Sequence, residues 1–222
     1  MPRFDAVLLD LDGTLVDTES IAVAAGVEAL AQMGHDVGPE VIRALVGRDH
    51  ASGHRMLAEM LGAEIPEAPL DAAWTDAARR RMADGLPLRP GVHALLDRLD
   101  ALEMARAVVT SSKTAGARHK LDRAGLAARL PLVIAFEDVT APKPAPEPYL
   151  AAAARLSVDP ARCLAFEDSE TGAQAARAAG CLTVQVPDLE PASGRHADHV
   201  AETLLDGAAL AGLMPGTLPF SG

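Results

Sequence analysis

Two aspartates, Asp10 and Asp12, stand near the start of the chain and are followed by Gly13 and Thr14. They come directly after the apolar run 6–9, which predicts a buried strand bounded by turn residues. Residues two apart in an extended chain point to the same side. Two like charges at the edge of a core are costly unless a cation or a reaction uses them. The alternative is a solvated Asp-Gly turn, and this motif alone leaves both readings open.

Three further polar groups stand beyond apolar runs in the same way. They are Thr110 with Ser111 after the run 105–109, Lys143 in a proline-rich loop beyond the run 132–135, and Glu167 with Asp168 after the run 163–166. In an open parallel sheet, ligands bind outside the carboxyl ends of the strands, so we expect all four groups to meet. Each has an ordinary alternative, because hydroxyls and Asp168 can cap helices and Lys143 can be a solvated loop lysine.

The elements that must position these residues follow from the hydrophobic pattern. Apolar runs predict five strands, at 4–9, 105–109, 132–135, 163–166 and 182–186. Amphipathic stretches of about ten residues separate the later runs and predict helices. Strands that alternate with helices imply right-handed crossovers and a mostly parallel sheet. The sequence therefore predicts an α/β fold, with a Rossmann-like parallel sheet and helices on both faces.

The stretch between the first and second strands has a different character. It carries four helical patterns and no strand-like alternation, and the Pro/Gly-rich stretch 87–91 ends it. We expect an all-α cap domain of residues 16–88, inserted after the first strand of a core domain formed by 1–15 and 89–222. The two domains are expected to hinge near Val16 and 86–90 and to close during the reaction.

The four motifs together resemble those of haloacid dehalogenase superfamily phosphohydrolases with a helical C1-type cap, the subfamily of β-phosphoglucomutases and sugar phosphatases. The family's DxDGT motif matches 10–14, and its strand ending in Ser or Thr matches 108–111. Its lysine in a proline-rich loop matches Lys143, and its acidic pair matches 167–168. The resemblance covers nearly the whole chain, with the motifs in order and at typical spacing.

This resemblance implies a role for each matching residue. Asp10 would attack phosphorus and form an aspartyl phosphate. Asp12 would protonate the leaving oxygen and then activate water. Thr14 would orient the nucleophile loop. The phosphate oxygens would be received by Thr110, Ser111 and Lys143.

The same resemblance implies a metal. A dianionic phosphate beside carboxylates would be repelled, and hard oxygen ligands favour Mg²⁺ as the cation that offsets the charge. Asp10, the backbone carbonyl of Asp12, and Asp168 would hold it, with Glu167 acting through a water.

Three residues are further candidates for substrate contacts. Glu19 resembles an acidic position that borders the pocket in this family, and Arg48 resembles part of a cap loop that reaches the site. Lys113 follows the Thr110 motif directly. Arg48 can equally be an ordinary exposed arginine.

The branches of the family differ at a few residue positions, and the residues of this chain at those positions can be compared with each branch. Dehalogenases lack the second aspartate, which is present here as Asp12. Phosphonatases use a cap lysine, and no lysine occurs between Val16 and Leu88. Phosphoglucomutases carry a cap histidine where this chain has Ala22. We therefore expect a Mg²⁺-dependent phosphatase for a small phosphomonoester such as a sugar phosphate. The alternatives are a β-phosphoglucomutase-like mutase and an idle relative that only binds a phosphorylated ligand.

The composition of the chain limits the kinds of partner that it is expected to bind. The formal charge of −11 over 222 residues argues against general nucleic-acid binding and against binding to acidic membranes. No run approaches the roughly 18 apolar residues of a membrane span. Cys163 and Cys181 adjoin apolar runs, which suggests buried thiols in a reducing compartment. We expect a cytoplasmic protein with a small phosphorylated metabolite as partner, a monomer in the first instance, with a dimer left open.

Overall fold

The computed structural model describes residues 3–45, 50–83, 85–188 and 191–214. The chain divides into two compact units, one of Met1–Val16 with Pro87–Gly222 and the other of Asp17–Leu86. The first, the sheet unit, carries the strands, and the second, the helical unit, is the segment inserted after the first strand. Among the described residues, no helix is both long enough and apolar enough to cross a membrane.

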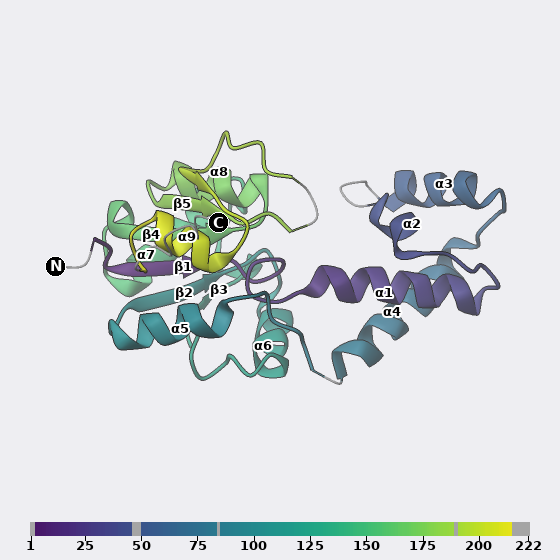
Figure 1. The fold of residues 1–222 in the computed structure, drawn as a ribbon, viewed down its shortest axis with the longest axis horizontal. Helices are drawn as coiled ribbons and strands as arrows, with labels where there is room; N and C mark the ends of the chain where they lie inside the picture. The colour runs from purple at the N-terminus through teal and green to yellow at the C-terminus, as the bar shows by residue number, and fades with distance from the viewer. Residues whose placement is uncertain (1–2, 46–49, 84, 189–190, 215–222) are drawn as a thin grey trace, which may run out of the picture. The chain divides into compact units, whose positions relative to one another are not determined.

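A six-stranded parallel sheet forms the centre of the sheet unit (Figure 1). Its strands are β1 (Ala6–Leu9), β2 (Ala105–Val109), β3 (Val133–Ile134), β4 (Cys163–Glu167), β5 (Leu182–Gln185) and β6 (His199–Val200). Their spatial order is β3-β2-β1-β4-β5-β6, and every neighbouring pair runs parallel. The five expected strands are present. The edge strand β6 was not predicted, because His199–Val200 contains a single apolar residue and forms no apolar run.

Alternate residues along the strands face different helices. Leu8 and Ala165 belong to a buried cluster with residues of α7 (Glu147–Leu156) and α8 (Glu170–Ala178). Phe166, the next residue along β4, lies against Gly207 of α9 (Leu204–Leu210), where a Cβ would approach its ring to 3.2 Å. Helices therefore cover both faces, as expected, and this explains why the strands are continuously apolar.

The remaining helices of the sheet unit are α5 (Val92–Ala101), which contacts α9, and α6 (Thr114–Arg123), which follows β2 and contacts β3. Short 3₁₀ turns cover Phe136–Asp138 and Pro160–Arg162. Both cysteines are buried free thiols, as expected.

The helical unit consists of α1 (Thr18–Gln32), α2 (Pro39–Arg43), α3 (His50–Leu61) and α4 (Glu67–Ala83). The helices α1 and α4 pack together through Trp74, whose indole N–H donates to the carbonyl of Ala22 at 2.9 Å. The ring sits so close to Gly26 that a Cβ there would lie 2.5 Å from it. Glu28 adds ion pairs to Arg80 and Arg81 at 2.8 and 2.9 Å. The described part of the insert is all-helical, as the sequence predicted.

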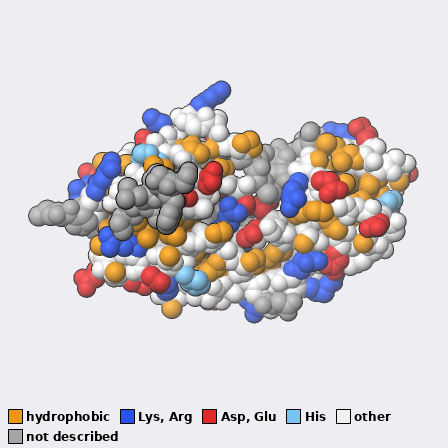
Figure 2. Space-filling model, in the orientation of Figure 1, with side chains coloured by type: hydrophobic (Ala, Val, Ile, Leu, Met, Phe, Trp, Pro, Cys, Tyr) orange, Lys and Arg blue, Asp and Glu red, His pale blue; other side chains and the backbone are white. Residues whose placement is uncertain are grey.

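Charged side chains of both signs are interspersed on the face drawn in Figure 2. They do not gather into one basic patch on that face.

Candidate active site

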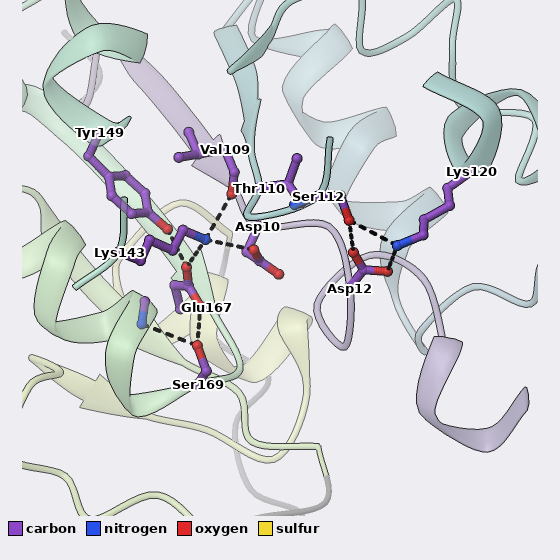
Figure 3. A network of polar contacts seen from close by, with 11 residues as sticks. Asp10, Asp12, Val109, Thr110, Ser112, Lys120, Lys143, Tyr149, Glu167 and Ser169 are labelled. Atoms are coloured by element: carbon purple, nitrogen blue, oxygen red, sulfur yellow. Dashed lines mark hydrogen bonds and ion pairs between the residues drawn. The ribbon is translucent and has the colours of Figure 1, made fainter. Parts of the chain in front are cut away.

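A buried ion-pair network joins the ends of β1 and β4 to the loop before α7 (Figure 3). The ammonium group of Lys143 donates to Asp10 Oδ1 at 2.7 Å, to Glu167 Oε1 at 2.5 Å and to the carbonyl of Val109 at 2.9 Å. A lysine has three N–H donors, so these contacts use them all. The structure thus brings Lys143, Asp10 and Glu167, which are far apart in the sequence, into direct contact.

Local structure holds Glu167 rigidly. Its Oε1 also accepts a hydrogen bond from the hydroxyl of Tyr149 in α7, at 2.5 Å. Its Oε2 accepts from the hydroxyl of Ser169 at 3.1 Å, and the same hydroxyl caps α8 by accepting from the Gly172 amide. A Cβ at Gly172 would lie 2.0 Å from Oε2, so only glycine leaves room for this carboxylate. Both oxygens of Glu167 are therefore occupied by protein donors.

Burial and neighbouring charges shift the pKa values of the ionisable side chains in this network. Burial raises the pKa of Asp10 to about 7, with the Glu167 charge adding to the effect and the Lys143 charge opposing it. Burial together with the charges of Asp10 and Glu167 raises the pKa of Asp168 to about 8. Burial alone would lower the pKa of Lys143, but its two carboxylate partners outweigh this and raise it. The lysine stays charged, while Asp10 and Asp168 titrate near neutrality without a cation.

The residues present fit a hard divalent cation. One carboxylate oxygen each of Asp10, Glu167 and Asp168 lie within 4.8 Å of one another. Asp10 Oδ2 is buried and has no hydrogen-bond partner among the described residues. Gly13, at a φ of +83°, admits Asp168, since a Cβ there would lie 2.3 Å from its Oδ2. Clustered carboxylate oxygens are the donors that a hard cation prefers.

The side chain of Asp12 has different partners from that of Asp10. Its Oδ1 accepts from the ammonium of Lys120 at 2.6 Å, and its Oδ2 accepts from the hydroxyl of Ser112 at 2.8 Å (Figure 3). The sequence did not identify Lys120 or Ser112 as site residues. The available signal was the rarity of lysine, since Lys113, Lys120 and Lys143 are the only three in the chain.

Thr110 and Ser111 lie directly after β2, which ends at Val109. Together with Asp10, Asp12 and Lys143, among others, they line a cavity of about 310 Å³. The Thr110 hydroxyl also accepts from the Ser112 amide at 3.0 Å and so shapes the turn after β2.

The other predicted residues lie in different settings. Thr14 is buried, and its hydroxyl oxygen has no hydrogen-bond partner in the described part of the chain. Lys113 is exposed at the N-cap of α6 and is not among the described residues that line the cavity. Glu19 lies in α1 of the helical unit. Arg48 lies outside the described residues.

Comparison with known proteins now gives the family. The family model of haloacid dehalogenase-like hydrolases matches residues 4–180. The chain belongs to this family. The hydrolase is 33% identical over 184 residues to the fructose-1-phosphate phosphatase YqaB of Escherichia coli, which covers 83% of this chain and 97% of that protein. It is 34% identical over 187 residues to hexitol phosphatase A of the same organism, covering 83% of each chain.

Solved structures agree with this assignment. A haloacid dehalogenase family hydrolase of Deinococcus radiodurans, solved with bound phosphate and sodium, has a TM-score of 0.79 and 28% identity, covering 96% of this chain and 98% of its own. Proteins of the β-phosphoglucomutase type are also among the structural relatives. This hydrolase is therefore a phosphatase of the haloacid dehalogenase type, a phosphoric monoester hydrolase, as the sequence predicted.

Proposed function

We propose that this hydrolase releases phosphate from a small phosphorylated sugar or sugar alcohol through an aspartyl phosphate on Asp10. The observation that carries this proposal is the state of the Asp10 carboxylate. Its Oδ1 is held by Lys143, and its buried Oδ2 has no hydrogen-bond partner among the residues that the structure describes. Asp10 lines the cavity. A fixed carboxylate with one uncommitted oxygen is suited to attack an electrophile placed in that cavity.

In this proposal Asp10 Oδ2 attacks phosphorus while the bond to the substrate's ester oxygen breaks. Asp12 gives a proton to that leaving oxygen, and then takes a proton from the water that attacks the phosphorus of the aspartyl phosphate. Phosphate departs and Asp10 is regenerated. Lys143 keeps its proton throughout and holds the nucleophile in one orientation.

The phosphate oxygens would be received by hydroxyl and amide groups around the cavity. Thr110 and Ser111 line it, and we assign phosphate contacts to them. Lys143, whose three donors are taken by Asp10, Glu167 and Val109, would act on the phosphate through its charge. Thr14, whose buried hydroxyl has no partner within the described ranges of the chain, would orient the nucleophile loop. Glu19, Arg48 and Lys113 remain our candidates for contacts with the rest of the substrate.

Magnesium is our proposed cofactor. Asp10 and Asp168 would bind it directly, with the backbone carbonyl of Asp12 as a third ligand and Glu167 acting through a water. When bound, Mg²⁺ would neutralise the charge of the phosphate against these carboxylates.

The substrate class rests on the relatives and on the lysine distribution. The two named Escherichia coli phosphatases act on fructose-1-phosphate and on hexitol phosphates, as their names state. The helical unit contains no lysine, which favours hydrolysis over the mutase reaction that the family resemblance left open.

A phosphate-release assay with the purified chain and Mg²⁺ tests the proposal. The panel contains fructose 1-phosphate, hexitol phosphates, nucleotides and p-nitrophenyl phosphate. We expect sugar phosphates to be preferred, Asp10→Asn to abolish turnover, and Asp122→Asn, an exposed carboxylate on α6, to leave it unchanged. Absence of turnover on every compound, or an Asp10→Asn variant as active as the parent, contradicts the proposal. Isomer interconversion stimulated by a bisphosphorylated sugar would support the mutase instead.

A further inference from the structure

The second aspartate of the site is held by its own closed set of hydrogen bonds. Lys120 Nζ donates to Asp12 Oδ1 at 2.6 Å and to Ser112 Oγ at 3.0 Å, and Ser112 Oγ donates to Asp12 Oδ2 at 2.8 Å. Each of the three side chains contacts the other two. One partner on each carboxylate oxygen fixes both the position and the plane of the Asp12 carboxylate.

This set differs in exposure from the pair that Lys143 makes with Asp10. The side chains of Lys143 and Asp10 are 6% and 9% exposed, whereas those of Lys120 and Asp12 are 22% and 31% exposed. A nucleophile works best in a closed setting, but a group that exchanges protons with a leaving oxygen and with water must be reachable from the cavity. The structure supplies one lysine for each of these two aspartates.

The partners of Asp12 come from the turn after β2 and from α6, whose backbones are held by a hydrogen bond and by packing. Ser112 lies in the turn after β2, which the hydroxyl of Thr110 fixes by accepting from the Ser112 amide. Lys120 lies in the second half of α6, on a helix whose residues Ala117 and Leu121 are buried. Because both partners are anchored, they can hold Asp12 against rotation about its side-chain torsions.

We propose that Lys120, acting with Ser112, is a positioning residue that orients Asp12 toward the leaving oxygen. This inference rests on the proposed phosphatase function. In the first step the phosphorus–oxygen bond breaks, the electron pair stays on the leaving oxygen, and that oxygen takes the proton from Asp12. In the second step the attacking water gives a proton to Asp12. Lys120 keeps its proton in both steps and touches neither reacting atom.

The dependence of the rate on the leaving group tests this assignment. Phenyl phosphate releases a poor leaving group and needs an acid, whereas dinitrophenyl phosphate releases a good one and does not. General acid catalysis contributes about 10²–10⁴-fold, so losing its orientation in Lys120→Met should lower kcat/KM for phenyl phosphate by about 10- to 100-fold. This ratio reports the first step, in which dinitrophenyl phosphate needs no acid, so kcat/KM for that compound should fall by less than about threefold. The second step is common to both compounds, and any loss there lowers its rate for both alike.

Two further variants test the same inference, so that it does not depend on the Lys120→Met substitution alone. Lys120→Arg keeps a donor for Asp12 and should restore most of the rate on phenyl phosphate. Ser112→Ala should show the same selectivity for the poor leaving group, to a smaller extent. The matched control is Arg118→Met, which removes a cation from the same helix. The Arg118 side chain donates to the carbonyl of Pro131.

The outcomes separate this inference from the proposed function. If Lys120→Met lowers kcat/KM equally for both aryl phosphates, Lys120 acts on the phosphate or on the fold and the inference is wrong. An unchanged or faster Lys120→Met enzyme overturns it as well. If the parent chain releases phosphate from neither aryl phosphate and from no compound of the earlier panel with Mg²⁺ present, the proposed function fails instead.

Discussion

The hydroxyl of Tyr149 offers a sharp test of how the site is held together. Tyr149 is fully buried in α7 and donates to Glu167 Oε1 at 2.5 Å, the same oxygen that accepts from Lys143. Burial and the nearby Glu167 charge raise the pKa of Tyr149, so the hydroxyl keeps its proton and remains a donor. The substitution Tyr149→Phe removes this donor and leaves the packed ring in place.

The expected size of the effect follows from the charge of the acceptor. A hydrogen bond to a charged group contributes about 1.5–3 kcal/mol, and losing it leaves a buried carboxylate short of a donor. No cavity term adds to this, because the ring remains. A chain of this length shifts Tm by about 2–4 °C per kcal/mol, so Tm should fall by about 3–12 °C. The phosphatase rate should fall too, since Glu167 and Lys143 lose part of their support.

A second buried hydroxyl provides the matched control. Thr183 in β5 is equally buried, and its hydroxyl donates at 3.2 Å to the carbonyl of Cys181, a neutral acceptor. Thr183→Val should cost only about 0.5–1.5 kcal/mol and leave the rate unchanged. Thermal and urea unfolding of both variants, with phosphate-release rates, gives the comparison. If Tyr149→Phe costs no more than Thr183→Val and keeps full activity, the network does not depend on this donor and our reasoning is wrong.

Two further predictions concern the carboxylates. Gly172→Ala should destabilise the fold, because its Cβ would lie 2.0 Å from Glu167 Oε2. Gly116→Ala in α6, where a Cβ would meet no described atom within 4 Å, should stabilise it by up to about 1 kcal/mol. Chemical denaturation should show opposite signs for the two variants, and equal signs would contradict the packing. Without metal, the pKa values of Asp10 and Asp168, about 7 and about 8, lie above the ordinary 3.8, so their contribution to stability is present at low pH and is lost as pH rises through these values. Mg²⁺ binds the ionised carboxylates. The difference in Tm between samples with Mg²⁺ and samples with EDTA should therefore grow from about pH 6 to about pH 9. A difference that does not change with pH would contradict the proposed site.

Much of the fold could be predicted because its signals are local. The run Ala105–Val109 became β2 with those bounds, and continuous apolar runs with helices between them are typical of a parallel sheet covered on both faces. The strand ends then followed from topology, since all parallel strands present their carboxyl ends at one edge. The pairing of Lys143 with Glu167 and Tyr149 could not be predicted in the same way. It depends on how α7 packs across the sheet, and no periodicity in the sequence encodes the distance between those side chains.

The partner of Asp12 shows the same limit at the level of one helix. Proximity to the strand end favours Lys113, which follows the Thr110 motif, yet Lys113 is the exposed N-cap of α6 in an extended conformation. Lys120 lies seven residues further along and nevertheless reaches Asp12 at 2.6 Å. Side chains on a helix lean toward its N-terminus, and a lysine stem is long enough to extend this reach by another turn. The N-terminus of α6 lies just after the end of β2. A lysine two turns along the helix can therefore reach a side chain near this strand end better than a lysine that directly follows the strand in sequence. Closeness to the motif in sequence therefore does not predict which lysine binds Asp12. The direction in which the helix runs determines which of the three lysines reaches this aspartate.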